Sequence, residues 1–78
     1  MPRYFFHVDD GTVVIDREGV ELSDLMTARR EAIRTCGEMI RESPAVIWSG
    51  KPWRLWVTDQ PDAGGEILFA LNVFATEE

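Results

Sequence analysis

Near the amino terminus, His7, Asp9 and Asp10 form the cluster of residues best suited to chemistry in this chain. A carboxylate beside an imidazole orients the ring and raises its basicity, as in a general acid–base catalyst. His7 and Asp9 are two residues apart, so in a β-strand they lie on the same face. The competing interpretation makes His7 a sheet residue with a polar tip and both aspartates turn residues. We favour the second interpretation and expect a protein that is not an enzyme.

Metal and cofactor sites find little support in the sequence. The chain has one His and one Cys, whereas a zinc site takes several such ligands at set spacings. The Asp9-Asp10-Gly11 stretch lacks the alternating oxygen ligands and distal Glu of a calcium loop. Cys36 lies within an apolar helical pattern, so we interpret it as a small core residue of a cytoplasmic protein. We expect no metal and no cofactor.

Size and charge narrow the class of protein. The chain has 78 residues, 45% of them hydrophobic, and a net charge of −6, which predicts one small acidic domain spanning residues 1–78. Within residues 23–43, four Arg balance four acidic residues, so the whole negative excess lies outside this segment. An acidic chain is repelled by nucleic acid and anionic membranes. The longest apolar run, residues 67–71, is far too short to span a bilayer. Nucleic acid is therefore an unfavourable partner, and we expect no membrane.

The opening residues predict a strand over residues 3–8 that is covered on both faces. Alternation places Tyr4 and Phe6 on one face, and Phe5 and His7 on the other. The Asp10-Gly11 pair then predicts a hairpin into a short second strand over residues 12–16.

A helix over about residues 24–43 is the clearest expected element. Ser23 or Asp24 is suited to cap its amino end. Apolar residues recur at three- and four-residue steps along one stripe, and Pro44 favours an end at Ser43. Residues 45–50 then form a loop that either folds over the edge of the core or exposes a contact patch around Trp48.

Two further strands are expected over residues 52–58 and 66–74, giving an α+β fold of order ββαββ. The first and last strands are apolar on both faces and favour central positions. The strand over 12–16 is short and Pro52 begins the strand over 52–58, so both suit edges. Numbered along the chain, the expected order of the four-stranded, largely antiparallel sheet is 2-1-4-3.

One helix covers only one face of such a sheet, which leaves apolar side chains without cover. On this reasoning we name five candidates for an interface between copies of the chain: Phe5, Trp56, Leu68, Phe74 and Trp48. A large exposed apolar face is most simply explained by self-association. The alternative is that strong twist and residues 46–48 cover this face within one chain. We favour a homodimer.

Several segments resemble a family of short bacterial proteins that consist of a domain of unknown function. The resemblance rests on the opening Met-Pro-Arg-Tyr-Phe-Phe-His stretch, on residues 16–22 (Asp-Arg-Glu-Gly-Val-Glu-Leu), on the Ala- and Arg-rich helix, and on residues 53–59. It covers nearly the whole chain. The family carries no established activity, so the resemblance implies no catalytic residues. The second half, with Trp48, Trp53 and Trp56, is richer in Trp than is typical of this family.

The leading functional hypothesis is a small non-enzymatic interaction or regulatory module that self-associates through its sheet, with a further protein partner also compatible. The first alternative is an antitoxin-like or nucleic-acid-associated regulator, suggested by the size and class of the chain and opposed by its charge. The second is a small acid–base enzyme that uses His7 and Asp9.

Overall fold

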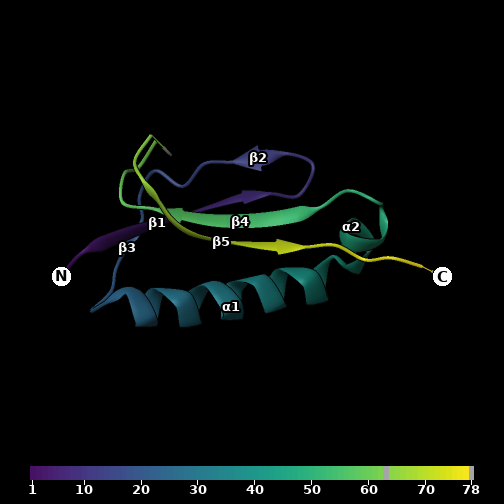
Figure 1. Cartoon of the computed structure of the whole chain (residues 1–78), viewed down its shortest axis with the longest axis horizontal. Coiled ribbons are helices and arrows are strands. Elements are labelled where there is room, and N and C mark those ends of the chain that lie inside the picture. The colour runs from purple at the N-terminus through teal and green to yellow at the C-terminus, as the bar shows by residue number, and fades with distance from the viewer. Residues whose placement is uncertain (63, 78) are drawn as a thin grey trace.

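A computed structural model describes residues 1–62 and 64–77. Its elements follow in the order β1 (Arg3–Asp9), β2 (Val13–Val14), β3 (Val20–Glu21), α1 (Leu25–Glu42), α2 (Pro44–Trp48), β4 (Trp53–Thr58) and β5 (Ile67–Val73). The sheet lies on one side of α1, and the short α2 packs at the end of the sheet where α1 finishes (Figure 1). The expected α+β class is confirmed, with five strands instead of four.

The sheet is antiparallel throughout, with the order β2-β1-β4-β5, and β3 also pairs with β1. β1 is the centre of the sheet, because it pairs with β4 on one side and with both short strands on the other. The first half of β1 pairs with β3 and its second half with β2. The two-residue β3 is the strand that the sequence did not reveal.

The expected strand order is wrong at the second hairpin. β4 lies between β1 and β5, and β5 is at the edge. Trp53, Leu55 and Val57 of β4 are each at most 2% exposed, as a central strand requires. Pro52 directly precedes β4 and so removes no hydrogen bond from its ladder. In β5, by contrast, the apolar side chains are half-buried or exposed.

α1 packs one stripe on the sheet because its small residues allow close approach. Ala28, Ala32 and Cys36, spaced by four residues, are the buried positions of the helix. The cap is Asp24, whose carboxylate accepts a 2.8 Å hydrogen bond from the Thr27 backbone N–H. This bond lowers the pKa of Asp24.

The expected loop over residues 45–50 is instead a helical turn, because Pro44 at the first helical position starts α2. Ile47 is buried in the core and Val46 packs against it, while Trp48 is 60% exposed. The segment therefore both closes the edge of the core and presents an exposed aromatic side chain.

Gly19 lies where the backbone before β3 passes close to β1. It has a φ of +68°, a conformation that side chains with a Cβ rarely adopt. An added Cβ would lie 2.8 Å from the Tyr4 carbonyl oxygen and 2.7 Å from the Phe5 ring. A glycine here lets the segment before β3 cross directly over Phe5.

We predict that Gly19→Ala destabilises the protein by about 1–3 kcal/mol, because both the backbone angle and the contact with Tyr4 are unfavourable. Urea unfolding followed by circular dichroism measures the change. Gly37→Ala is the matched control, since Gly37 is helical and an added Cβ meets nothing within 4 Å. That variant should gain about 0.5–1 kcal/mol. Equal effects at the two positions would contradict this account.

Candidate functional site

The His7 side chain lies at the middle of β1, and none of its surface is exposed. Nε2 is 2.8 Å from Oγ1 of Thr58, a residue of β4 that is equally buried. Nδ1 accepts a 3.0 Å hydrogen bond from the backbone N–H of Asp16. Both ring nitrogens are therefore engaged, and they join β1, β4 and the segment after β2.

This pattern fixes the protonation state of His7. The Thr58 hydroxyl donates to the Gln60 carbonyl at 2.7 Å, so it accepts from His7 Nε2–H. Nδ1 must be unprotonated to accept from Asp16. Burial lowers the pKa of His7, although the carboxylates of Asp16 and Asp62 act against this. The imidazole is thus neutral and serves as a bridge between strands.

Asp16 is the functional residue that sequence reasoning missed. Its carboxylate accepts three backbone hydrogen bonds of 3.0–3.1 Å, from Gly19, Phe6 and Glu18. Partial burial opposes ionisation, but these bonds lower the pKa of Asp16 below its ordinary value. An Asp followed by Gly three residues later is typical of a side-chain-capped turn, and this was the available signal.

Asp9 and Asp10 do not join His7 in these contacts. The Asp9 carboxylate accepts from Gly11 N–H at 3.0 Å, and the Asp10 carboxylate from Thr12 N–H at 3.2 Å. Each aspartate caps its own backbone two residues on, as turn aspartates do. The carboxylate that lies beside His7 in the structure belongs to Asp16.

The five interface candidates fall into three classes of exposure. Phe5 is 5% exposed, so the expectation that it lies on an uncovered face is wrong, and Gly19 lies directly against its ring. Trp56 and Leu68 are half-buried. Phe74 and Trp48 are 70% and 60% exposed. Of the five candidates, the two that are largely exposed therefore lie just after β5 and on α2.

Trp56 forms the centre of a stack on the face of the sheet opposite α1. Its ring centroid is 5.4 Å from that of His7 on the neighbouring strand β1. Arg54, two residues earlier on β4 and on the same face, places its guanidinium carbon 5.3 Å from the indole centroid. Such cation–π contacts contribute about 0.5–1 kcal/mol at exposed sites. Trp56 is half-buried in this stack, although α1 covers the other face of the sheet.

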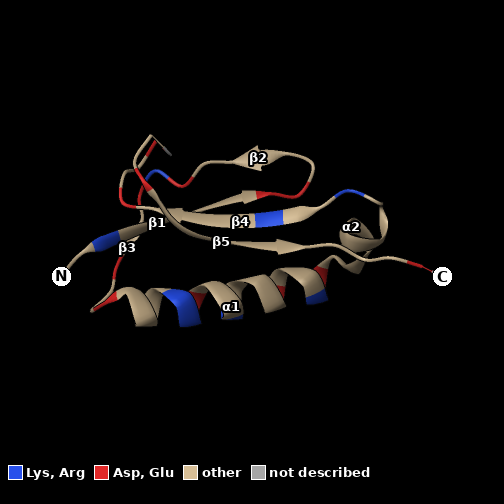
Figure 2. Ribbon diagram, in the orientation of Figure 1, with Lys and Arg blue, Asp and Glu red and all other residues tan. Residues whose placement is uncertain are grey.

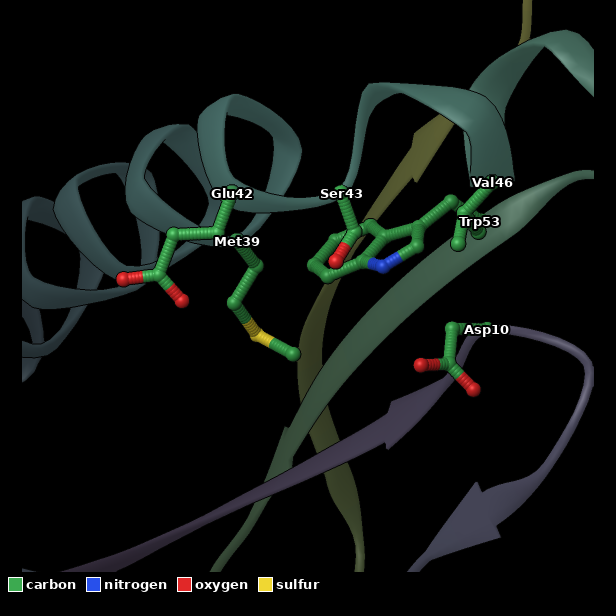
Figure 3. Close-up of a pocket in the computed structure, with 6 residues that line it drawn as sticks. All are labelled: Asp10, Met39, Glu42, Ser43, Val46 and Trp53. Atoms are coloured by element: carbon green, nitrogen blue, oxygen red, sulfur yellow. The ribbon is translucent and has the colours of Figure 1, made fainter.

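A small cavity lies where the end of β1 meets the junction of α1 and α2 (Figure 3). Asp10, Glu42, Ser43 and Trp53 are among its lining residues, and its volume is about 70 Å³. Sites for small molecules usually measure about 300–1,000 Å³. This cavity is therefore suited to water or a very small polar group.

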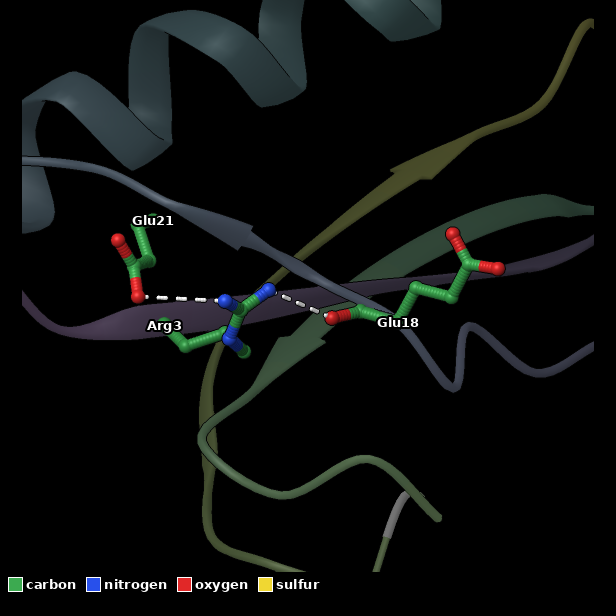
Figure 4. Close-up of polar contacts among 3 residues, drawn as sticks. All are labelled: Arg3, Glu18 and Glu21. Atoms are coloured by element: carbon green, nitrogen blue, oxygen red, sulfur yellow. Dashed lines mark hydrogen bonds and ion pairs between the residues drawn. The ribbon is translucent and has the colours of Figure 1, made fainter.

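Arg3 fastens the start of β1 to the segment around β3 (Figure 4). Its guanidinium donates to the Glu18 carbonyl at 2.8 Å and pairs with the Glu21 carboxylate at 3.2 Å. Both side chains of the ion pair are about half exposed, so the pair contributes at most about 1 kcal/mol.

Charged side chains and possible metal ligands are spread over several elements of the fold. Lys and Arg lie on several separate elements, and acidic residues interrupt them along α1 (Figure 2). Within residues 1–62 and 64–77, no group of three or more His, Cys, Asp or Glu side chains is placed to hold a metal ion. Burial raises the pKa of the Cys36 thiol. No helix in this part of the chain is long and apolar enough to cross a membrane.

A family model described as "Domain of unknown function (DUF6894)" matches residues 3–75. The chain belongs to this family. The match spans the elements from β1 to β5, including the Asp16 turn and the His7 bridge. No curated protein and no solved structure is detectably similar to the chain.

We predict that the free energy of unfolding decreases as the pH falls below about 6.5, the ordinary pKa of a histidine. Because the pKa of His7 is lowered by folding, the unfolded chain takes up a proton at a pH where the folded chain does not. The same sign holds for Asp16 at lower pH, below the ordinary range of a carboxyl group. Urea titrations between pH 8 and 5 measure the effect. His7→Asn should flatten the slope across this window, and an unchanged slope would contradict the assignment.

We predict that Asp16→Ala costs about 3 kcal/mol of stability, because three backbone N–H groups lose their acceptor at about 1 kcal/mol each. Asp10→Ala is the control, since its exposed carboxylate accepts one backbone bond and should cost about 1 kcal/mol or less. Thermal unfolding of both variants is the measurement. A loss at Asp16 no larger than that at Asp10 would refute the role given to Asp16.

Proposed function

We propose that this protein is a small non-enzymatic interaction module that self-associates through its sheet. The observation that carries the proposal is the large apolar surface left exposed by one chain. Met26, Ile33, Trp48, Ile67 and Phe74 are each 50–70% exposed, beside a core of ten buried hydrophobic residues among residues 1–62 and 64–77. Exposed apolar groups of this kind mark interaction sites, and a small domain gains stability by burying them against a partner.

The non-enzymatic part of the proposal is supported by the way His7 is used. A general base needs a free nitrogen within reach of a substrate. Thr58 and the Asp16 backbone engage both nitrogens of His7, and the ring has no exposed surface. Asp9, the expected partner of His7, caps a turn instead.

The oligomeric state tests the proposal directly. Light scattering coupled to size-exclusion chromatography, at protein concentrations from 1 to 100 µM, should give a dimer mass at the upper end. The dimer should persist in high salt, because apolar burial is not screened by ions. A monomer at every concentration, with no binding of a hydrophobic dye, would overturn the proposal.

A further inference from the structure

We infer that two copies of this chain pair through the free edge of β5, antiparallel, so that one continuous sheet runs through the dimer. This inference rests on the proposed self-association and names the surface that performs it.

β5 has the properties of an edge that pairs. It extends over seven residues, Ile67–Val73, and none of them is charged. Among the described residues it pairs only with β4, so its outer backbone N–H and C=O groups face away from the sheet. Natural proteins blunt unpaired edges with charge, Pro, bulges or short strands. The opposite edge follows this rule, because β2 has only two residues. A register shift opposite Val57 and Thr58 leaves Leu68 without a partner on β4, at the start of β5. Pairing is regular from Phe69 to Val73, so these five residues form the regular free edge.

The two ends of β5 match each other in an antiparallel pair. Ile67, at the start of the strand, is 50% exposed, and Phe74, just after its end, is 70% exposed. Antiparallel pairing places the start of one strand beside the end of the other. Each Ile67 therefore lies near the end of β5 of the second copy, just beyond which Phe74 follows, and this proximity occurs twice.

The flank of α1 on the β5 side carries two exposed apolar side chains. Glu42 and Asp10 line one cavity, which shows that the Glu42 flank of α1 faces the β1 end of the sheet. Ile33 is nine residues from Glu42, and at about 100° per residue it lies on the opposite flank. Ile33 and Met26 are 61% and 59% exposed there, and they line one shallow depression together with Arg29, Arg30 and Arg34.

These features together favour a second copy over an extended peptide. Two identical antiparallel strands are related by a two-fold axis perpendicular to the sheet, so both α1 helices lie on the same face. The two flanks, each with Met26 and Ile33, then face each other above the paired strands. The inner side of β5, where Phe69, Leu71 and Val73 are half-buried, gains cover from the same step. A single peptide strand would pair with the free backbone groups of β5 but would leave the α1 flank uncovered.

Cysteine cross-linking tests the pairing and locates the axis. Residues directly opposite each other in an antiparallel pair have Cα atoms about 4.5–5.5 Å apart, within the span of a disulfide. Only the residue at the axis faces its own copy, while a residue two positions away is about 13 Å from its copy. The test uses Phe69→Cys, Ala70→Cys, Leu71→Cys and Asn72→Cys, each in a Cys36→Ala background, under mild oxidation.

One of these four variants should cross-link to a covalent dimer with severalfold higher yield than the others. The control is Val13→Cys on β2, which is 56% exposed and should remain monomeric on a non-reducing gel. Cross-linking at Val13, or at none of the β5 positions while the unmodified chain is a dimer, would overturn the β5 interface and leave self-association standing. A monomeric unmodified chain would overturn both.

A second pair of variants reports on the α1 flank without altering β5. Ile33→Lys should weaken the dimer by about tenfold or more in dissociation constant, measured by sedimentation, because it removes an apolar contact and adds a positive charge beside Arg29, Arg30 and Arg34. Val14→Lys is the matched control, because Val14 is 59% exposed and lies at the opposite edge, and the substitution adds the same charge. Equal weakening by the two variants would contradict the placement of this flank at the interface.

Discussion

The Asp16 carboxylate replaces a missing strand partner in the centre of the sheet. β2 pairs with the end of β1 and β3 with its beginning, and Phe6 lies between the two. Its backbone N–H donates to Asp16 Oδ2, so β1 keeps a hydrogen-bond partner where the neighbouring strand is interrupted. The same carboxylate turns the chain at Glu18 and Gly19. The placement of β3, the cover over Phe5 and the burial of His7 all depend on this group.

His7 extends that constraint across the sheet. The ring connects the Asp16 backbone on one side of β1 to Thr58 of β4 on the other. A buried polar group is stable only when its bonding capacity is met, and here both nitrogens have partners. The segment over residues 16–22, which carries part of the family resemblance, therefore has a structural explanation. It closes one face of the central strand.

The sequence was informative where a local pattern sets the structure. The α1 stripe, the Asp24 cap and the Asp10-Gly11 turn are all visible within a few residues. The strand order could not be read from such local patterns, because the strands expected over residues 3–8 and 66–74 are both apolar on two faces, but for different reasons. β1 is buried by neighbours on both sides, whereas β5 stays half exposed at the edge. The contact from Asp16 to His7 spans nine residues and has no periodic signal.

The pairing of β1 with β4 has a consequence for the order of events during synthesis. Phe5 lies opposite Thr58, so the central ladder joins residues more than fifty positions apart. A growing chain that has released only β1, β2, β3 and α1 holds a helix with no sheet wide enough to receive it. Closing so long a loop is entropically costly and slows folding. The nascent chain must therefore keep the aromatic side chains of β1 from aggregating until β4 has left the ribosome.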